Sequence, residues 1–260
     1  MRLNNTEHHM AARRRGTVAA ALLALTLTFG GCTVYHPQAV DIPLINHSGD
    51  ARIDASAGLS FWLLPDAVTL NLTGTYGFNN WLAGQAHVNY GGDNMYAQLA
   101  PGIYLRLGEH SVLEGYAGMG YGSTWRDNIT ESSTAEEGES TSGTYSLKGS
   151  YMLPFVQANL GWHDLTGANF DIGFGLKAGG YLPDINYTRL DKEGNEVADS
   201  REHYESPNFL LEPQMMLRLG SQKVKFNVKL GFTVLSDVSG DPGHFMYDWF
   251  TASAGITIAL

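Results

Sequence analysis

The feature that most constrains the fold of this chain is an alternation of apolar and polar residues with a period of two, which recurs along residues 50–260. In the segment RIDASAGLSFW, for example, Ile53 and Leu59 share one face of an extended chain, and Arg52 and Asp54 share the other. This period indicates β-strands with two chemically different faces. Nine further segments repeat it, so we expect an all-β fold with about ten strands: VTLNLTGTY, LAGQAHVNY, YAQLAPGIYLRL, VLEGYAGMGYG, MLPFVQANLGW, NFDIGFGLKAG, FLLEPQMMLRLG, VKFNVKLGFTVL and FTASAGITIAL.

The charged residues of these segments all fall on the polar phase of their strands. A soluble sandwich would turn that phase to water, whereas a membrane barrel would turn it to the lumen and its apolar phase to lipid. The polar phase is also rich in glycine, which suits a narrow interior crossed by side chains from opposing strands. We therefore predict a network of paired charges in the lumen of a closed barrel that does not conduct well: Arg52, Asp54, Arg106, Glu114, Asp171, Lys177, Glu212, Arg218, Lys225 and Lys229.

The lengths of the connections favour the membrane barrel. Three connections are long, at residues 123–145, 182–207 and 236–248, and they follow the fifth, seventh and ninth predicted strands. All three therefore emerge at one end of an antiparallel barrel, as long external loops do in outer-membrane proteins. The prediction is an antiparallel transmembrane β-barrel of about ten strands, within a range of roughly eight to twelve. Three prolines inside predicted strands would mark bulges or an error of two in the strand count: Pro101, Pro154 and Pro213.

The first 32 residues have the order of an export signal. A basic cluster at residues 13–15 precedes the apolar run TVAAALLALTLTF, which is shorter than the roughly 20 residues of a membrane-spanning helix. Gly30 and Gly31 then precede Cys32, the only cysteine of the chain. This ending resembles the lipobox of bacterial lipoproteins, in which the cysteine is acylated and becomes the first mature residue, although Phe29 stands where leucine is usual. The alternative is an ordinary cleaved signal with an incidental cysteine, and the true start is either Met1 or Met10.

The resulting organisation is a signal peptide over residues 1–31, an acylated Cys32 with an irregular periplasmic tether over 32–49, and the barrel over 50–260. From about Tyr35 to Leu260 the chain resembles the small outer-membrane β-barrel lipoproteins of diderm, or Gram-negative, bacteria, including a group with a segment like YHPQAVDIPLI ahead of the barrel. Leu260 departs from the terminal phenylalanine or tryptophan of many such barrels. The resemblance implies an outer-membrane location, a lipid anchor and two periplasmic barrel termini. It implies no chemistry, because most members of that group have no assigned activity.

The charge of the chain excludes one class of partner. There are 16 Lys and Arg residues against 26 Asp and Glu residues, and Arg2 and the basic cluster at 13–15 belong to the signal, so the mature chain is strongly acidic. Nucleic acid is therefore not expected as a partner. We expect contacts with outer-membrane lipid and lipopolysaccharide, with another envelope protein as a further candidate. No cofactor is expected.

The predicted connections contain residues that could form catalytic or metal sites. Some small barrels are enzymes that pair histidines with acids or serines, and His203, Glu205, His244 and Asp248 lie in predicted external loops, where they could form a triad-like or metal site. Nothing in their spacing requires this, and the acidic loops lack the ordered spacing of a calcium loop. The spacing of His110 beside Ser111 and of His163 beside Asp164 does not require a catalytic or metal site either. We expect His87 to be a lumen residue hydrogen-bonded to its neighbours. Weak binding of divalent cations that bridge to lipopolysaccharide phosphates is left open.

The expected function is therefore non-enzymatic, with no catalytic or metal residues, and has a structural, docking or surface-interaction role. The first alternative is a narrow porin for small solutes. The second is a membrane-surface enzyme that uses loop histidines and acids.

Overall fold

The computed structural model describes residues 33–35, 40–61, 65–91, 93–134, 140–165, 167, 169–236 and 246–260. The predicted signal peptide and Cys32 lie outside this part of the chain. The strands are β1 (Thr33–Tyr35), β2 (Ala51–Phe61), β3 (Pro65–Gly77), β4 (Leu82–Gly91), β5 (Asn94–Arg106), β6 (Ser111–Thr134), β7 (Ser140–Leu165), β8 (Phe170–Leu190), β9 (Glu196–Tyr204), β10 (Asn208–Gly220), β11 (Val224–Phe232), β12 (Val234–Leu235), β13 (Met246–Tyr247) and β14 (Phe250–Ala259). Within the described residues, no helix has the length and apolar character needed to cross a membrane.

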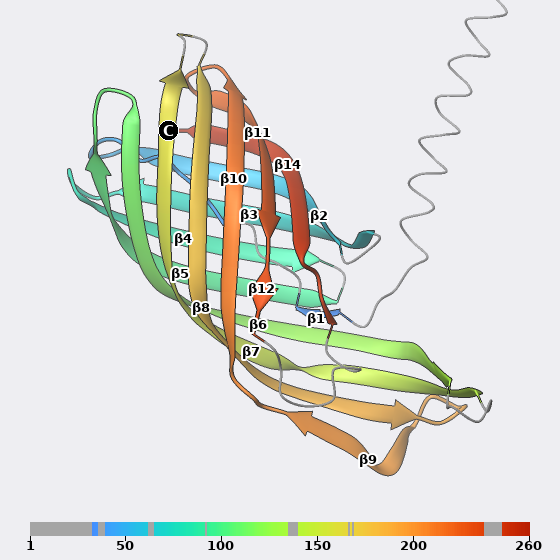
Figure 1. Cartoon of the computed structure of the whole chain (residues 1–260). Coiled ribbons are helices and arrows are strands. Elements are labelled where there is room, and N and C mark those ends of the chain that lie inside the picture. The colour runs from blue at the N-terminus through green and yellow to red at the C-terminus, as the bar shows by residue number, and fades with distance from the viewer. Residues whose placement is uncertain are drawn as a thin grey trace, which may run out of the picture.

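Ten of these strands form a closed antiparallel barrel (Figure 1). Neighbours in the sequence are neighbours in the sheet from β2 to β8, after which β10, β11 and β14 follow. The barrel closes where β14 pairs with β2, in a register that runs from Phe250 opposite Phe61 to Ala259 opposite Arg52. The ten segments with a period of two correspond to these ten strands, so the predicted fold class is confirmed.

The two faces of the wall have opposite chemistry. On β5 the buried and exposed positions alternate almost without interruption, with Gln98 buried in the lumen and Leu99 exposed on the outside. The outward side chains are mostly large and apolar, such as Leu70, Val156 and Phe226. An apolar band of this extent is stable against lipid and not against water.

The prolines leave the strands intact. The pairing of β5 with β6 has the same register on both sides of Pro101, and the pairing of β7 with β8 has the same register on both sides of Pro154. Pro213 pairs with Leu176 within an unbroken ladder between β10 and β8. The prolines therefore mark neither bulges nor an error in the strand count.

The barrel has two unlike ends. We call one the turn end, where the connections 78–81, 107–110, 166–169 and 221–223 are short and where the Leu260 amide donates to the Ala51 carbonyl at 2.9 Å. We call the other the hairpin end, because β6 and β7 extend beyond the barrel there and β8 pairs with β9. Figure 1 shows these hairpins projecting at the bottom of the view, far from the C-terminus.

The prediction of long loops at 123–145 and 182–207 is corrected, because most of these residues are in strands. Backbone pairing continues from Ile129 opposite Tyr145 to Thr134 opposite Ser140, although the sequence there is polar on both faces. Ladder hydrogen bonds do not need an apolar face, so periodicity does not reveal such strands. Stacking of Tyr145 on Tyr187, with ring centroids 4.7 Å apart, adds packing at the base of the hairpins. Of the predicted loop 236–248, residues 237–245 lie outside the described residues.

A second correction concerns the predicted tether. Residues 40–46, which we call the plug, lie inside the barrel, and Val40, Asp41, Ile42, Leu44 and Ile45 are at most 3% exposed. The plug has no regular secondary structure, as expected, but it fills the lumen that the ten strands enclose. Between residues 40 and 49, the exposed residues are 47–49, which form a turn at the turn end.

A charge introduced on the outward face tests which surface meets lipid. Leu99→Arg, near the middle of β5, should lower the free energy of unfolding by about 2–4 kcal/mol in lipid vesicles, whereas Leu107→Arg, beyond the end of that strand, should cost roughly 0–1 kcal/mol. Both leucines are exposed, at 69% and 54%, so a water-facing wall would tolerate both changes equally. Urea unfolding followed by tryptophan fluorescence measures the difference.

Candidate functional site

The backbone of the plug is held by side chains of the barrel wall. Gln157 and Asn159, on β7, donate hydrogen bonds to the Asp41 carbonyl at 2.7 and 3.2 Å. Arg218, on β10, donates from Nη1 to the Pro43 carbonyl at 3.1 Å. A peptide without secondary structure would leave its buried carbonyl groups without partners, and these wall residues supply them.

A carboxylate holds the next part of the plug. The Ile45 amide donates to Glu114 Oε1 at 2.7 Å, and Asn159 donates to Glu114 Oε2 at 3.0 Å. The Asn46 side chain then reaches His163, at the turn end of β7, with 3.4 Å between Nδ2 and Nε2. Wall side chains therefore contact the plug backbone from Asp41 to Ile45 and its side chain at Asn46.

The Asp41 carboxylate belongs to a buried cluster of four charges. Lys229 Nζ lies 2.9 Å from Asp41 Oδ1 and 2.8 Å from Asp54 Oδ1. The Arg218 guanidinium lies 3.8 Å from Asp41 and 4.0 Å from Asp54. All four side chains are at most 4% exposed, so two cations face two carboxylates away from water. One of the four charges comes from the plug and three come from the wall.

The apolar side chains of the plug occupy space left by wall glycines. A Cβ atom added at any of three lumen glycines would approach a plug side chain too closely. These pairs are Gly161 with Leu44 (2.5 Å), Gly173 with Ile42 (2.7 Å) and Gly175 with Val40 (3.0 Å). The glycines on β7 and β8 thus shape the wall to the plug.

Tyr35 fills the lumen nearer the hairpin end. Its hydroxyl donates to Glu212 Oε1 at 2.7 Å, and its ring meets the edges of Tyr151 and Tyr181 with centroids 5.8 and 5.2 Å away. Lys177 Nζ lies 3.6 Å from Glu212 Oε2 and 4.6 Å from the centroid of the Phe155 ring. Aromatic rings and one further ion pair therefore occupy this part of the lumen.

The predicted charge network divides into groups. Asp54, Arg218 and Lys229 meet around the plug, and Glu114 binds the plug backbone. Three ion pairs lie elsewhere: Asp171 with Lys225 at 2.6 Å, Lys177 with Glu212, and Arg52 with Asp50 at 3.4 Å at the turn end.

The prediction that Arg106 belongs to the lumen network is corrected. Arg106 has the predicted phase, but it is exposed, because the last buried residue of β5 is Tyr104. The sequence pattern did not identify Asp41, Gln157 and Asn159 as lumen contacts. The alternation of Val40, Ile42 and Leu44 around Asp41 was a signal that could have identified the plug.

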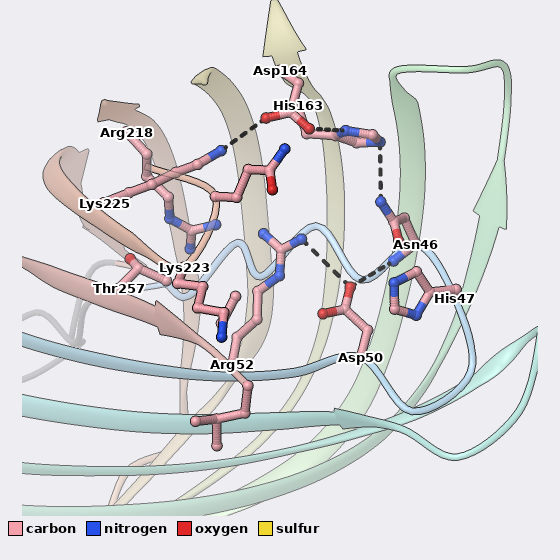
Figure 2. A pocket seen from close by; sticks show the side chains of 13 residues that line it. Asn46, His47, Asp50, Arg52, His163, Asp164, Arg218, Lys223, Lys225 and Thr257 are labelled. Carbon is pink, nitrogen blue, oxygen red and sulfur yellow. Dashed lines mark hydrogen bonds and ion pairs between the residues drawn. The ribbon is translucent and has the colours of Figure 1, made fainter. Parts of the chain in front are cut away.

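A cavity of about 290 Å³ opens at the turn end, where the plug leaves the lumen (Figure 2). Two ion pairs lie in its lining, where Arg52 Nη2 is 3.4 Å from Asp50 and Lys225 Nζ is 3.2 Å from Asp164. The cavity is therefore a mouth of the barrel whose lining includes paired cations and carboxylates.

The loop histidines do not assemble a site in the described residues. His203 lies 3.5 Å from Glu205 on the exposed β8–β9 hairpin, whereas Asp248 is buried, and His244 lies outside the described residues. His110 and His163 contact each other at the turn end, with ring centroids 5.8 Å apart. Within the part of the chain that is described, no three His, Cys, Asp or Glu residues are grouped as metal ligands. His87 is a buried lumen residue, with Nδ1 2.8 Å from the Thr73 hydroxyl.

Comparison with known proteins identifies the fold. No family model and no curated protein matches the sequence. The outer membrane protease OmpT from Escherichia coli has a similar structure, with a TM-score of 0.56 and 12% identity over 86% of this chain and 99% of that one. The translocator domain of the autotransporter NalP from Neisseria meningitidis matches with a TM-score of 0.43, at 12% identity over 97% and 95% of the two chains. At this identity the likeness to OmpT extends to the fold of an outer-membrane β-barrel and not to its activity.

A disulfide can test the position of the plug. A Cβ at Gly173 would lie 3.6 Å from Ile42 Cβ, which is within the range of disulfide geometry. The double variant Ile42→Cys/Gly173→Cys should therefore form a disulfide, seen as a mobility change on non-reducing gels after unfolding. Gly74 lies on the outward face of β3, where an added Cβ would meet nothing within 4 Å, so Ile42→Cys/Gly74→Cys is the control. Equal oxidation of both pairs would contradict the position of the plug.

Removing the plug carboxylate tests the buried charge cluster. Asp41→Asn should lower the free energy of unfolding by about 3–5 kcal/mol, because Lys229 and Arg218 would then share one carboxylate away from water. Asp184→Asn, whose side chain is 71% exposed on β8, is the matched control and should change it by less than about 0.5 kcal/mol. Urea unfolding of both variants measures this, and equal effects would contradict a buried role for Asp41.

Proposed function

We propose that this protein is a sealed outer-membrane β-barrel with a structural, docking or surface-interaction role. The observation that carries the proposal is the plug, whose backbone and side chains are bound by the lumen wall. A barrel whose interior is occupied by its own chain serves as a rigid support in the membrane. The β6–β7 and β8–β9 hairpins, which extend from one end, are the surfaces that this support presents.

The outer-membrane location is supported by the fold and by the apolar outward face. The short connections of the turn end correspond to periplasmic turns, and the extended hairpins correspond to external loops. With this orientation both ends of the barrel domain, at Ala51 and Leu260, are periplasmic. Lipid and lipopolysaccharide would contact the outward apolar side chains.

The lipid anchor is part of the proposal. The order of basic cluster, apolar run and glycines before Cys32 supports acylation of this residue. The barrel is itself embedded in the membrane, so the acyl chains would be a second attachment. They would fix the N-terminal part of the chain at a membrane surface.

The alternative functions have less support. A porin needs a continuous aqueous path, whereas here the lumen holds the plug, the tyrosines around Tyr35 and paired charges. A membrane-surface enzyme needs convergent catalytic groups, whereas His203 is exposed and Asp248 is buried. We therefore propose a non-enzymatic role, with partners that bind the hairpins.

Electrical recording in planar bilayers tests the sealed barrel. The wild-type protein should show no steady conductance. The triple variant Val40→Gly/Ile42→Gly/Leu44→Gly should produce flickering openings, because these side chains fill the space beside Gly175, Gly173 and Gly161. Val197→Ser, on the exposed β9, is the control and should stay closed. Large, stable, ion-selective openings in the wild type would reject the sealed barrel and favour the porin.

A further inference from the structure

One end of the plug lies at the turn end of the barrel. The Gly49 amide donates to the Gly77 carbonyl at 2.8 Å, where β3 ends, and β2 begins directly afterwards at Ala51. Figure 2 shows Asn46 and His47 at the cavity of this end, beside His163. The chain therefore enters the barrel wall from the turn end.

The other end of this segment points to the opposite face. Strand β1 pairs in parallel with β13, which belongs to the connection between β12 and β14 at the hairpin end. The Asp248 amide also donates to the Tyr35 carbonyl, at 3.3 Å. In Figure 1, β1 lies toward the hairpin side of the barrel, away from the C-terminus.

Contacts with a single wall strand give the direction of the segment between these ends. Along β7, successive parts of the N-terminal segment touch successive positions in the same order. The pairs are Tyr35 with Tyr151, Asp41 with Gln157 and Asn159, and Asn46 with His163. The step from Tyr35 to Asn46, 11 residues, nearly equals the step from Tyr151 to His163, 12 residues. The described parts of the segment, Thr33–Tyr35 and residues 40–46, therefore follow β7 in the same direction as β7 itself, from the hairpin end to the turn end.

We propose that the chain, followed from Thr33 to Asp50, passes through its own barrel from the hairpin end to the turn end, so that the segment before Thr33 starts from the face that carries the hairpins. This inference rests on the plugged barrel of the proposed function and adds a topology to it. The length of the chain is sufficient, because the residues from Tyr35 to Asp50 can span roughly 50 Å when extended, compared with an apolar band about 25 Å tall.

This topology changes the expected place of the anchor. Cys32 lies outside the described residues, but it is bonded to Thr33. Acyl chains on Cys32 would then enter the membrane from the hairpin face, whereas a periplasmic tether would place them on the turn face. In the orientation proposed above, the hairpin face is the cell surface.

Insertion of a short epitope between Cys32 and Thr33 of the full-length protein tests the exit. Two reference proteins carry the same epitope after Gly194, in the exposed turn before β9, or after Gln222, in the short turn between β10 and β11. Antibody binding is compared in intact cells and after permeabilisation of the outer membrane. We expect the epitope before Thr33 to behave like the one at Gly194, with most of its full signal already present in intact cells. Behaviour like the epitope at Gln222 would overturn the inference, whichever way the barrel faces.

A second measurement separates this inference from the proposed function. The Ile42→Cys/Gly173→Cys pair is introduced into each tagged protein, and its disulfide reports whether the plug is in place. If the disulfide forms and the epitope before Thr33 behaves like the reference epitope at Gln222, the proposed exit at the hairpin face is overturned. The sealed barrel is then unaffected. Absence of the disulfide from the untagged protein as well would overturn both. The comparison can be repeated without an insertion by labelling Thr33→Cys, Gly194→Cys and Gln222→Cys in intact cells with a membrane-impermeant maleimide. Labelling of Thr33→Cys like Gly194→Cys is expected, and labelling like Gln222→Cys would overturn the inference.

Discussion

The ion cluster of Asp41 with Lys229, Asp54 and Arg218 is the interaction on which the rest of the lumen depends. Charges removed from water are tolerated only when they are paired and hydrogen-bonded, because desolvation costs several kcal/mol per ion. Three of these four charges belong to the wall, and the plug supplies the fourth. The wall alone would have two cations for one carboxylate at this point. The plug and the barrel are therefore parts of one folding unit, and neither is complete without the other.

The same dependence governs the backbone of the plug. A peptide without helix or strand partners must find hydrogen bonds elsewhere, and Gln157, Asn159, Arg218 and Glu114 provide them. Glycines at the matching wall positions leave room for branched side chains, as Gly173 does for Ile42. Polar complementarity and steric complementarity thus select the same segment. This double fit supports a permanent part of the structure that seals the barrel, and it favours a supporting role over transport.

The asymmetry of the two ends connects this interior to the proposed role. At the turn end the connections are short, and two ion pairs lie at the cavity. At the hairpin end the wall strands continue past the barrel, and β9 adds a further strand to β8. The N-terminal segment points to the same end through the pairing of β1 with β13. A sealed barrel with this topology would bring the hairpins and the N-terminal segment to one membrane face, where a partner could contact both.

The sequence by itself determined the ten strands, the inward phase of their polar residues and the end from which the long connections emerge, because a period of two and the spacing of strands are local properties of the chain. The tertiary structure alone decided what the lumen holds. Asp41 and Lys229 are 188 residues apart, and Tyr35 and Glu212 are 177 apart, so no local pattern brings these groups together. The tertiary structure also decided the exposure of Arg106. The alternation along a strand gives the face to which a side chain points, but it does not show where the lumen ends. From the sequence alone, a segment without the period of a helix or strand is interpreted as a tether. Its binding site exists only in the closed barrel, because closure creates the space and brings together the charges that bind it.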